Sequence, residues 1–214
     1  MTKLGIAVSN PTATALTRAT AWRTVAITVC TVTWILALGY LAHGFIHEAY
    51  TPGAAGLNVQ HWPAASGIQR DTNRATLVMS AHPQCPCTDA SIYELAQILT
   101  RCQGKVSAKV LFIKPASFPD SWAKTKRWVE VNTIPGAEAI LDVDGVESAG
   151  FGAKTSGDVA VFDANGRLLF RGGITESRGH AGDNPGADAV IAAIESNTRA
   201  CFETSVFGCP LSGK

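Results

Sequence analysis

The stretch ATLVMSAHPQCPCTDASIYELAQIL, residues 75–99, decides the fold of this chain. It opens with a short apolar run that is suited to a buried strand, and a loop with two prolines follows. Thr88 or Asp89 can then cap the free amides of a helix start. The expected helix carries its apolar side chains on one face, at Ile92, Leu95, Ile98 and Leu99. Cys85 and Cys87 therefore lie where a buried strand passes into a helix.

The alternation of strands and helices continues toward the C-terminus. We expect strands at residues 106–113 and 139–142, helices at 121–131 and 145–151, a strand pair at 159–162 and 167–170, and a last helix with its apolar face at Ala187, Val190, Ile191 and Ile194. Residues 163–166 (DANG) join the strand pair as a hairpin turn. A crossover helix between the first two strands implies parallel pairing, and the hairpin adds antiparallel strands. The sequence thus predicts an α/β domain, a small mixed sheet flanked by helices.

The length and charge of the chain limit its function classes. Its 214 residues suffice for one ordinary domain with appendages. The net charge is +1 and no basic run occurs, so the chain offers no field to gather nucleic acid. Charged residues make up 16% of the chain, as expected if part of it lies in lipid. We therefore exclude nucleic-acid binding and look for a membrane segment.

A membrane-spanning helix is predicted at residues 24–45. No Asp, Glu, Lys or Arg occurs in residues 24–47, and the apolar centre has close to the roughly 20 residues that cross a bilayer. The charged residues before this segment are all basic, whereas the first charged residue after it is Glu48. The positive-inside rule then places the N-terminus in the cytoplasm and the rest of the chain on the other side.

A cleaved signal peptide is the competing interpretation of this segment. The apolar core of a signal peptide usually has about 7–15 residues, fewer than this segment has. Small residues near Ala42 and Gly44 still permit cleavage. A buried soluble helix is disfavoured because no polar stripe interrupts the segment. We expect an uncleaved single-pass anchor.

The predicted organisation has five parts. They are a cytoplasmic tail at residues 1–23, a transmembrane helix at 24–45, a linker at 46–72, a folded domain at 73–200 and a C-terminal tail at 201–214. The linker contains Pro52, Pro63 and several glycines, and it shows no convincing period.

The predicted catalytic residues are Cys85 and Cys87. A helix N-terminus carries partial positive charge and free amides, which stabilise a thiolate and lower its pKa. The thiolate is the species that attacks disulfides. We cast Cys85 as the attacking thiol and Cys87 as the resolving thiol, although the helix register could reverse these roles. One intervening residue closes a tight ring, so we expect a strained Cys85–Cys87 disulfide that is a fairly strong oxidant.

Two loops hold further candidates. His82 could stabilise a thiolate or bind a metal ion, or it could be an ordinary loop histidine. Arg178 lies in a glycine-rich loop with His180 and Asp183. If that loop folds over the dithiol, Arg178 would favour a thiolate; a solvated loop is the alternative.

The remaining cysteines are assigned separately. Cys201 and Cys209 close a short loop and could form a structural disulfide. Alternatively, Cys209 could approach the active pair as a third redox cysteine. We expect Cys102 in the core and Cys30 facing lipid or another helix, with no function for either.

Four stretches carry a resemblance to a known family. They are His82-Pro83-Gln84-Cys85-Pro86-Cys87, Thr155-Ser156-Gly157, residues 172–184 (GGITESRGHAGDN) and Val206-Phe207-Gly208-Cys209-Pro210. The chain resembles membrane-anchored thioredoxin-like proteins of bacteria, including those called RedB-like, over about residues 73–210. The resemblance implies a thioredoxin-like mixed sheet and thiol–disulfide chemistry, without a known substrate.

The chain departs from typical thioredoxins at two positions. It has one residue between its cysteines, where thioredoxins have two. Gly157 stands where thioredoxins place a cis-proline opposite the dithiol. A glycine allows close backbone approach, but it does not favour a cis bond as proline does.

The expected function is a membrane-tethered extracytoplasmic thiol–disulfide oxidoreductase of the bacterial inner membrane. Its partners would be protein thiols or disulfides outside the cytoplasm, and it needs no cofactor. The alternative is a thioredoxin-fold copper-binding or copper-delivery protein, because Cys85, Cys87 and a histidine could bind soft Cu(I).

Overall fold

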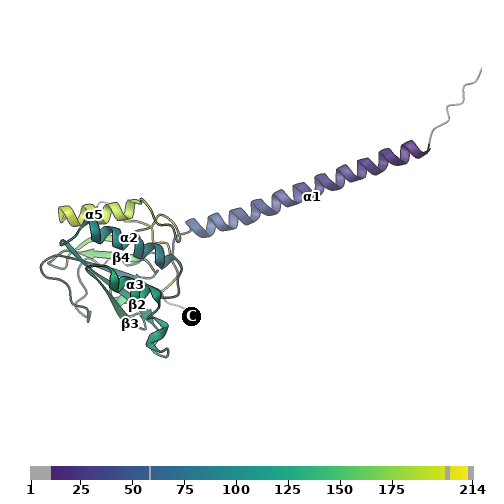
Figure 1. Cartoon of the computed structure of the whole chain (residues 1–214). Helices are drawn as coiled ribbons and strands as arrows, with labels where there is room; N and C mark the ends of the chain where they lie inside the picture. The colour runs from purple at the N-terminus through teal and green to yellow at the C-terminus, as the bar shows by residue number, and fades with distance from the viewer. Residues whose placement is uncertain (1–10, 58, 201–202, 212–214) are drawn as a thin grey trace, which may run out of the picture. The chain divides into compact units, whose positions relative to one another are not determined.

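The computed structural model describes residues 11–57, 59–200 and 203–211 (Figure 1). The chain divides into two units, Met1–His47 and Glu48–Lys214. The elements in chain order are α1 (Pro11–Tyr50), β1 (Ala75–Ala81), α2 (Cys87–Arg101), β2 (Val106–Lys114), the 3₁₀ turn η1 (Asp120–Trp122), α3 (Lys126–Thr133), β3 (Ala137–Val143), α4 (Val146–Gly150), β4 (Asp158–Phe162), β5 (Leu168–Gly172) and α5 (Pro185–Ser196).

Helix α1 contains the predicted apolar segment. Among the described residues, its part Thr20–Tyr50 is long and apolar enough to cross a membrane, a property that signal sequences share. Threonine hydroxyls within it donate to the carbonyl four residues earlier, at 2.8 to 3.0 Å, as at Thr28 and Thr31. These bonds satisfy the hydroxyls inside the helix, so the threonines are compatible with lipid.

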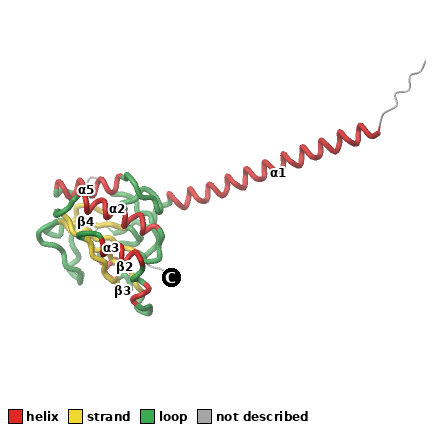
Figure 2. The backbone as a smooth tube through the Cα atoms, in the orientation of Figure 1, coloured by secondary structure: helices red, strands yellow, loops and turns green. Residues whose placement is uncertain are grey.

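The domain is built on a sheet with the strand order β3-β2-β1-β4-β5 (Figure 2). Strand β1 pairs in parallel with β2, and β2 in parallel with β3. On its other side β1 pairs antiparallel with β4, which forms the hairpin with β5. All residues of β1 are buried, as expected for a central strand covered on both faces. The predicted mixed sheet is confirmed.

Alternate residues of the strands face two separate clusters. Leu77 and Met79 contribute to the larger cluster, which helices α2, α3 and α5 cover. Val78 contributes to the smaller cluster on the other face, where Trp62 packs against Phe151 and Phe162 at centroid distances of 4.8 and 5.3 Å. Residues 60–68 therefore cover one face of the sheet, although we expected residues 46–72 to be a linker.

The structure also corrects two helix boundaries. The helix expected at residues 121–131 is divided into η1 and α3, because Thr125 adopts an extended conformation before α3. Helix α2 begins at Cys87, and no described side chain caps it. The predicted cap at Thr88 or Asp89 is therefore wrong, and both side chains bond elsewhere.

The buried ion pair between β4 and β5 gives a test of the fold. Asp158 and Arg171 lie 2.7 Å apart with side chains 1% and 6% exposed. Burial raises the pKa of Asp158 to about 6, although Arg171 opposes this shift. Arg171→Met should lower the free energy of unfolding by about 3–5 kcal/mol near pH 7, because it leaves a buried carboxylate without its partner.

The matched control is Arg167→Met, at a pair of 3.3 Å whose arginine is 60% exposed. It should cost about 1 kcal/mol or less. The cost of Arg171→Met should shrink near pH 5, where Asp158 is mostly protonated. Guanidinium unfolding of the full-length protein in detergent, followed by circular dichroism, measures these values. Equal losses in the free energy of unfolding for the two variants would contradict the role of Asp158 and Arg171 as a stabilising buried pair.

Candidate functional site

A tight loop connects β1 to α2 and holds the cysteine pair. The Cys85 N–H donates to His82 O and the Thr88 N–H donates to Cys85 O, both at 3.1 Å. Pro86 has φ −61° and ψ −31°, which are helical values. Proline fits this place because its missing N–H would be unpaired in a first helical turn. Cys85 thus lies just before the helical backbone, and Cys87 begins it.

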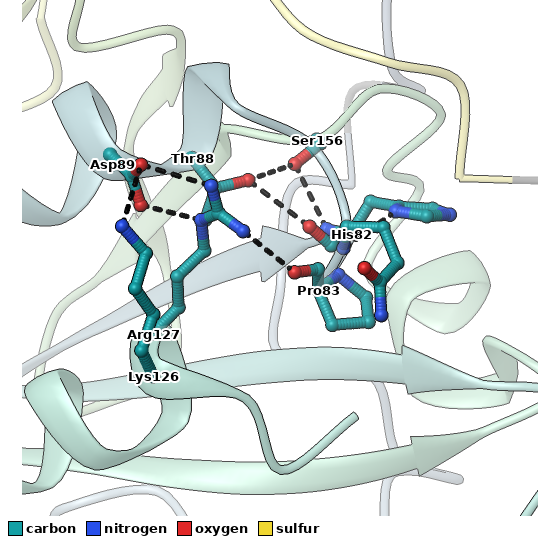
Figure 3. Close-up of polar contacts among 8 residues, drawn as sticks. His82, Pro83, Thr88, Asp89, Lys126, Arg127 and Ser156 are labelled. Carbon is teal, nitrogen blue, oxygen red and sulfur yellow. Dashed lines mark hydrogen bonds and ion pairs between the residues drawn. The ribbon is translucent and has the colours of Figure 1, made fainter. Parts of the chain in front are cut away.

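A buried hydroxyl ties this loop to the segment before β4 (Figure 3). Ser156 Oγ accepts from the His82 N–H at 2.9 Å and lies 3.0 Å from Thr88 Oγ1. Thr88 Oγ1 in turn donates to His82 O at 3.2 Å. Ser156 is 2% exposed and Thr88 is 1% exposed, so these bonds are shielded from water. Sequence reasoning assigned no role to Ser156; its only signal was its place in the Thr155-Ser156-Gly157 stretch.

Helix α3 holds the same loop from another side (Figure 3). Arg127 donates to Pro83 O at 3.0 Å and to the Asp89 carboxylate at 2.9 Å. A second Arg127–Asp89 contact measures 2.5 Å, and Lys126 lies 3.5 Å from the same carboxylate. The cysteine loop is therefore fixed to both α3 and the start of α2.

The C-terminal segment, residues 203–211, forms part of the site. The Ser156 N–H donates to Cys209 O at 2.8 Å, and the Leu211 N–H donates to Lys154 O at 2.9 Å. Gly208 lies so close to the segment before β4 that an added Cβ would be 2.0 Å from Ser156 O. We expected a C-terminal tail at residues 201–214, but its described part packs against the segment before β4.

Three cysteines in the described part of the chain lie near one another, namely Cys85, Cys87 and Cys209. Cys85 is 1% exposed, whereas Cys87 and Cys209 are half-buried. Cys209 and Cys87 lie near enough to Cys85 for their thiols and backbone N–H groups to act on its pKa. Cys209 is unbridged in this structure, and the predicted pairing with Cys201 involves a residue outside the described ones.

These contacts determine which of the three thiols ionises first. Burial raises the pKa of Cys85, but the hydrogen bonds from Cys209 and Cys87 outweigh it and lower the pKa overall. Burial and the neighbouring Cys85 charge raise the pKa of Cys87, against the pull of Arg178. Burial and Cys85 raise the pKa of Cys209 to about 12. The first thiolate therefore forms at Cys85, and the other two sulfurs keep their protons and donate to it.

Arg178 is the basic group at this cluster. Its Nη1 donates to Gly208 O at 2.8 Å, and it opposes the rise in the pKa of Cys87 that burial and Cys85 cause. Its Nε lies 3.4 Å from the exposed carboxylate of Glu48. The prediction that Arg178 approaches the dithiol is confirmed. His180 and Asp183 of the same loop are exposed.

His82 organises the loop but does not supply charge. Its Nδ1 accepts the Gln84 N–H at 3.1 Å, and its ring meets Trp122 edge-on at 5.6 Å. Burial lowers the pKa of His82, so the ring is neutral near pH 7. A neutral ring offers little stabilisation to a thiolate.

Gly157 lies immediately before β4, beside this network. Its φ is +89°, a region that favours glycine, and its N–H donates to Ser80 O at 2.8 Å. An added Cβ would be 3.0 Å from Ser91 Oγ of α2. Gly157 thus permits close approach of this segment to α2.

No protein-family model and no curated protein matches this chain. Solved structures do match. A hypothetical protein of Sinorhizobium meliloti has a TM-score of 0.58 and 18% identity, over 75% of this chain and 97% of that one. An uncharacterized conserved protein of Geobacillus kaustophilus has a TM-score of 0.53 and 14% identity, over 77% of this chain and 93% of that one. Together with the strand order, these two likenesses decide the fold.

The chain has the thioredoxin fold. A secreted disulfide oxidoreductase of Mycobacterium tuberculosis is also similar, at 14% identity and a TM-score of 0.41, over 59% of this chain and 83% of that one. Within the thioredoxin fold, the cysteine loop occupies the connection from β1 to α2. Two features distinguish this site from that of typical thioredoxins. A single residue separates Cys85 from Cys87, and the C-terminal segment supplies a third cysteine, Cys209.

The hydrogen bonds at Cys85 predict its titration. Thiolate absorbance of the reduced protein should begin to rise below the ordinary pKa of a thiol, because Cys85 ionises first. Cys85→Ser should remove this early rise. Cys209→Ala should move it to higher pH by removing a donor, whereas Cys209→Ser, which keeps a hydroxyl donor, should move it less. An early rise that persists in Cys85→Ser would assign the thiolate to another residue.

Proposed function

We propose that this protein is a membrane-tethered thiol–disulfide oxidoreductase whose nucleophile is Cys85. The observation that carries the proposal is the position of Cys85, which is buried immediately before the first turn of α2 in a loop fixed by Ser156 and Arg127. A thiolate held there attacks disulfide sulfur at a working pH at which an ordinary thiol would remain protonated. The thioredoxin fold supports the same chemistry, since it places the cysteine loop between the carboxyl end of the central strand β1 and the start of α2.

The proposed reaction begins with attack of Cys85 on a partner disulfide. A Cys85–partner bond forms, the partner bond breaks, and one partner sulfur leaves with the electron pair and a proton. Cys87 then attacks Cys85, forms the Cys85–Cys87 disulfide and releases the second partner thiol. Two electrons and two protons pass from the enzyme to the partner, and the same steps in reverse oxidise a partner dithiol.

The proposed location is the bacterial inner membrane, with the domain on its outer side. The apolar part of α1 and the basic residues before it support this orientation. The proposed partners are protein thiols or disulfides outside the cytoplasm, where disulfides persist.

A copper site finds less support in the geometry. It was expected to use Cys85, Cys87 and a histidine, but His82 packs on Trp122 and its Nδ1 is engaged by Gln84. In residues 11–57, 59–200 and 203–211, no group of three or more His, Cys, Asp and Glu side chains is arranged to hold a metal ion. Tight Cu(I) binding without disulfide exchange would nevertheless favour this alternative.

The exchange reaction tests the assignment of Cys85. Reduced full-length protein in detergent is mixed with oxidised glutathione, and released glutathione is measured. Cys85→Ser should slow the reaction about 100-fold or more, because it removes the stabilised thiolate. Cys30→Ser, which changes an exposed cysteine of α1, is the matched control and should react like the wild type. Full activity in Cys85→Ser would refute the proposed function.

The anchor is tested in bacterial cells. An uncleaved anchor predicts that the full-length mass remains in the membrane fraction after an alkaline carbonate wash. Protease added to spheroplasts should then degrade the domain, because it lies outside the cytoplasmic membrane. A soluble product that begins after residue 42 would show a cleaved signal peptide instead.

A further inference from the structure

The C-terminal segment brings Cys209 beside the loop that holds the nucleophile of the proposed reaction. Cys209 O accepts the Ser156 N–H at 2.8 Å, and Ser156 Oγ accepts the N–H of His82 in the cysteine loop at 2.9 Å. Further backbone bonds hold the segment at Lys154 and at Gly53, whose N–H donates to Val206 O at 2.8 Å. Cys209 is also close enough to Cys85 to lower its pKa, so Cys85 has two potential disulfide partners, Cys87 and Cys209.

We propose that Cys209 is a third redox-active cysteine, which replaces Cys87 in a disulfide with Cys85. This inference rests on the function proposed above, because it needs Cys85 to enter a disulfide first. It adds a catalytic residue and a second oxidised form of the enzyme.

The step is an internal exchange without net oxidation. The Cys209 sulfur attacks Cys85 of the Cys85–Cys87 disulfide. The Cys85–Cys209 bond forms and the Cys85–Cys87 bond breaks. Cys87 leaves with the electron pair and takes up the proton that Cys209 loses. One disulfide and one thiol are present among the three cysteines before and after the step.

The charges of the site favour this order of events. Besides burial, the hydrogen bond and the charge of Cys85 raise the pKa of Cys209. Both of these causes vanish once Cys85 is bonded to another sulfur, while Arg178 still lowers the pKa of Cys209. Arg178 also lowers the pKa of Cys87, so its positive charge favours the thiolate that leaves.

Ring size favours the product. A disulfide between cysteines one residue apart closes a tight ring, whereas Cys85 and Cys209 belong to separate segments that are both bonded to Ser156. The exchange therefore releases the strain of the tight ring. It also frees Cys87, which is more exposed than Cys85.

Disulfide mapping tests the inference. Reduced full-length protein in detergent is oxidised with limiting glutathione disulfide, quenched by alkylation and mapped as peptides without reduction. We expect Cys85–Cys209 as the main disulfide in the wild type and as the disulfide formed in Cys87→Ser. In Cys87→Ser/Cys209→Ser, the glutathione adduct on Cys85 should clear about tenfold more slowly or worse, because both resolving thiols are gone.

Two glycine substitutions distinguish the effect of the position of Cys209 from the effect of its thiol chemistry. Gly208→Ala keeps all the cysteines but pushes the segment away from Ser156 O, so it should reduce the Cys85–Cys209 yield severalfold. Gly150→Ala, at the end of α4, is the control because an added Cβ there meets no atom within 4 Å. It should leave the yield unchanged. Equal yields in the two variants would overturn the inference.

Other outcomes bear on the two proposals separately. A Cys201–Cys209 disulfide in the wild type would overturn the role of Cys209. So would equal adduct lifetimes in Cys87→Ser and the double variant. In both cases, glutathione reduction that depends on Cys85 would leave the proposed function standing. If the wild type does not react with glutathione disulfide at all, the proposed function fails and this inference fails with it.

Discussion

The site depends on the pairing of β1 with its neighbours. Strand β1 is buried on both faces and ends at the cysteine loop. On its β4 side, Ser80 is paired with Asp158, and the Gly157 N–H continues the pairing to Ser80 O. This register places Ser156 opposite the first residue of the loop, where its hydroxyl accepts the His82 N–H. A shift of one residue would turn Ser156 to the other face and leave a buried amide without a partner.

A buried thiolate is costly unless several donors surround it, and this requirement explains the arrangement around Cys85. The start of α2 supplies the Cys87 N–H, and the C-terminal segment supplies the Cys209 N–H and thiol. Arg178 adds positive charge beside the two outer sulfurs. The most buried cysteine of the three is thus the one that ionises first. In the proposed function, the reactivity of Cys85 comes from these donors rather than from exposure to water.

Irregular segments complete both faces of the domain. Trp62 and its neighbours cover the smaller cluster, and the C-terminal segment covers the cysteine loop. Such segments lack internal hydrogen-bond ladders, so they are held by single backbone bonds and by close contacts at glycines such as Gly208. The buried Asp158–Arg171 pair fixes β4 to β5 beside the same region. The position of Cys209 therefore depends on how the C-terminal segment packs against the residues before β4.

The sequence by itself determined the elements and the position of the dithiol. Apolar runs with a period near two or 3.6 identify buried strands and helix faces, and a cysteine pair between β1 and α2 must lie at a helix start. It left the position of Cys209 open, it took residues 46–72 for a linker, and it assigned no role to Ser156. Only the tertiary structure decided these points, because contacts between residues 74 or 124 positions apart follow from strand order and register. Local sequence patterns carry no record of such pairings, since they arise when distant segments compete to cover the same buried surface.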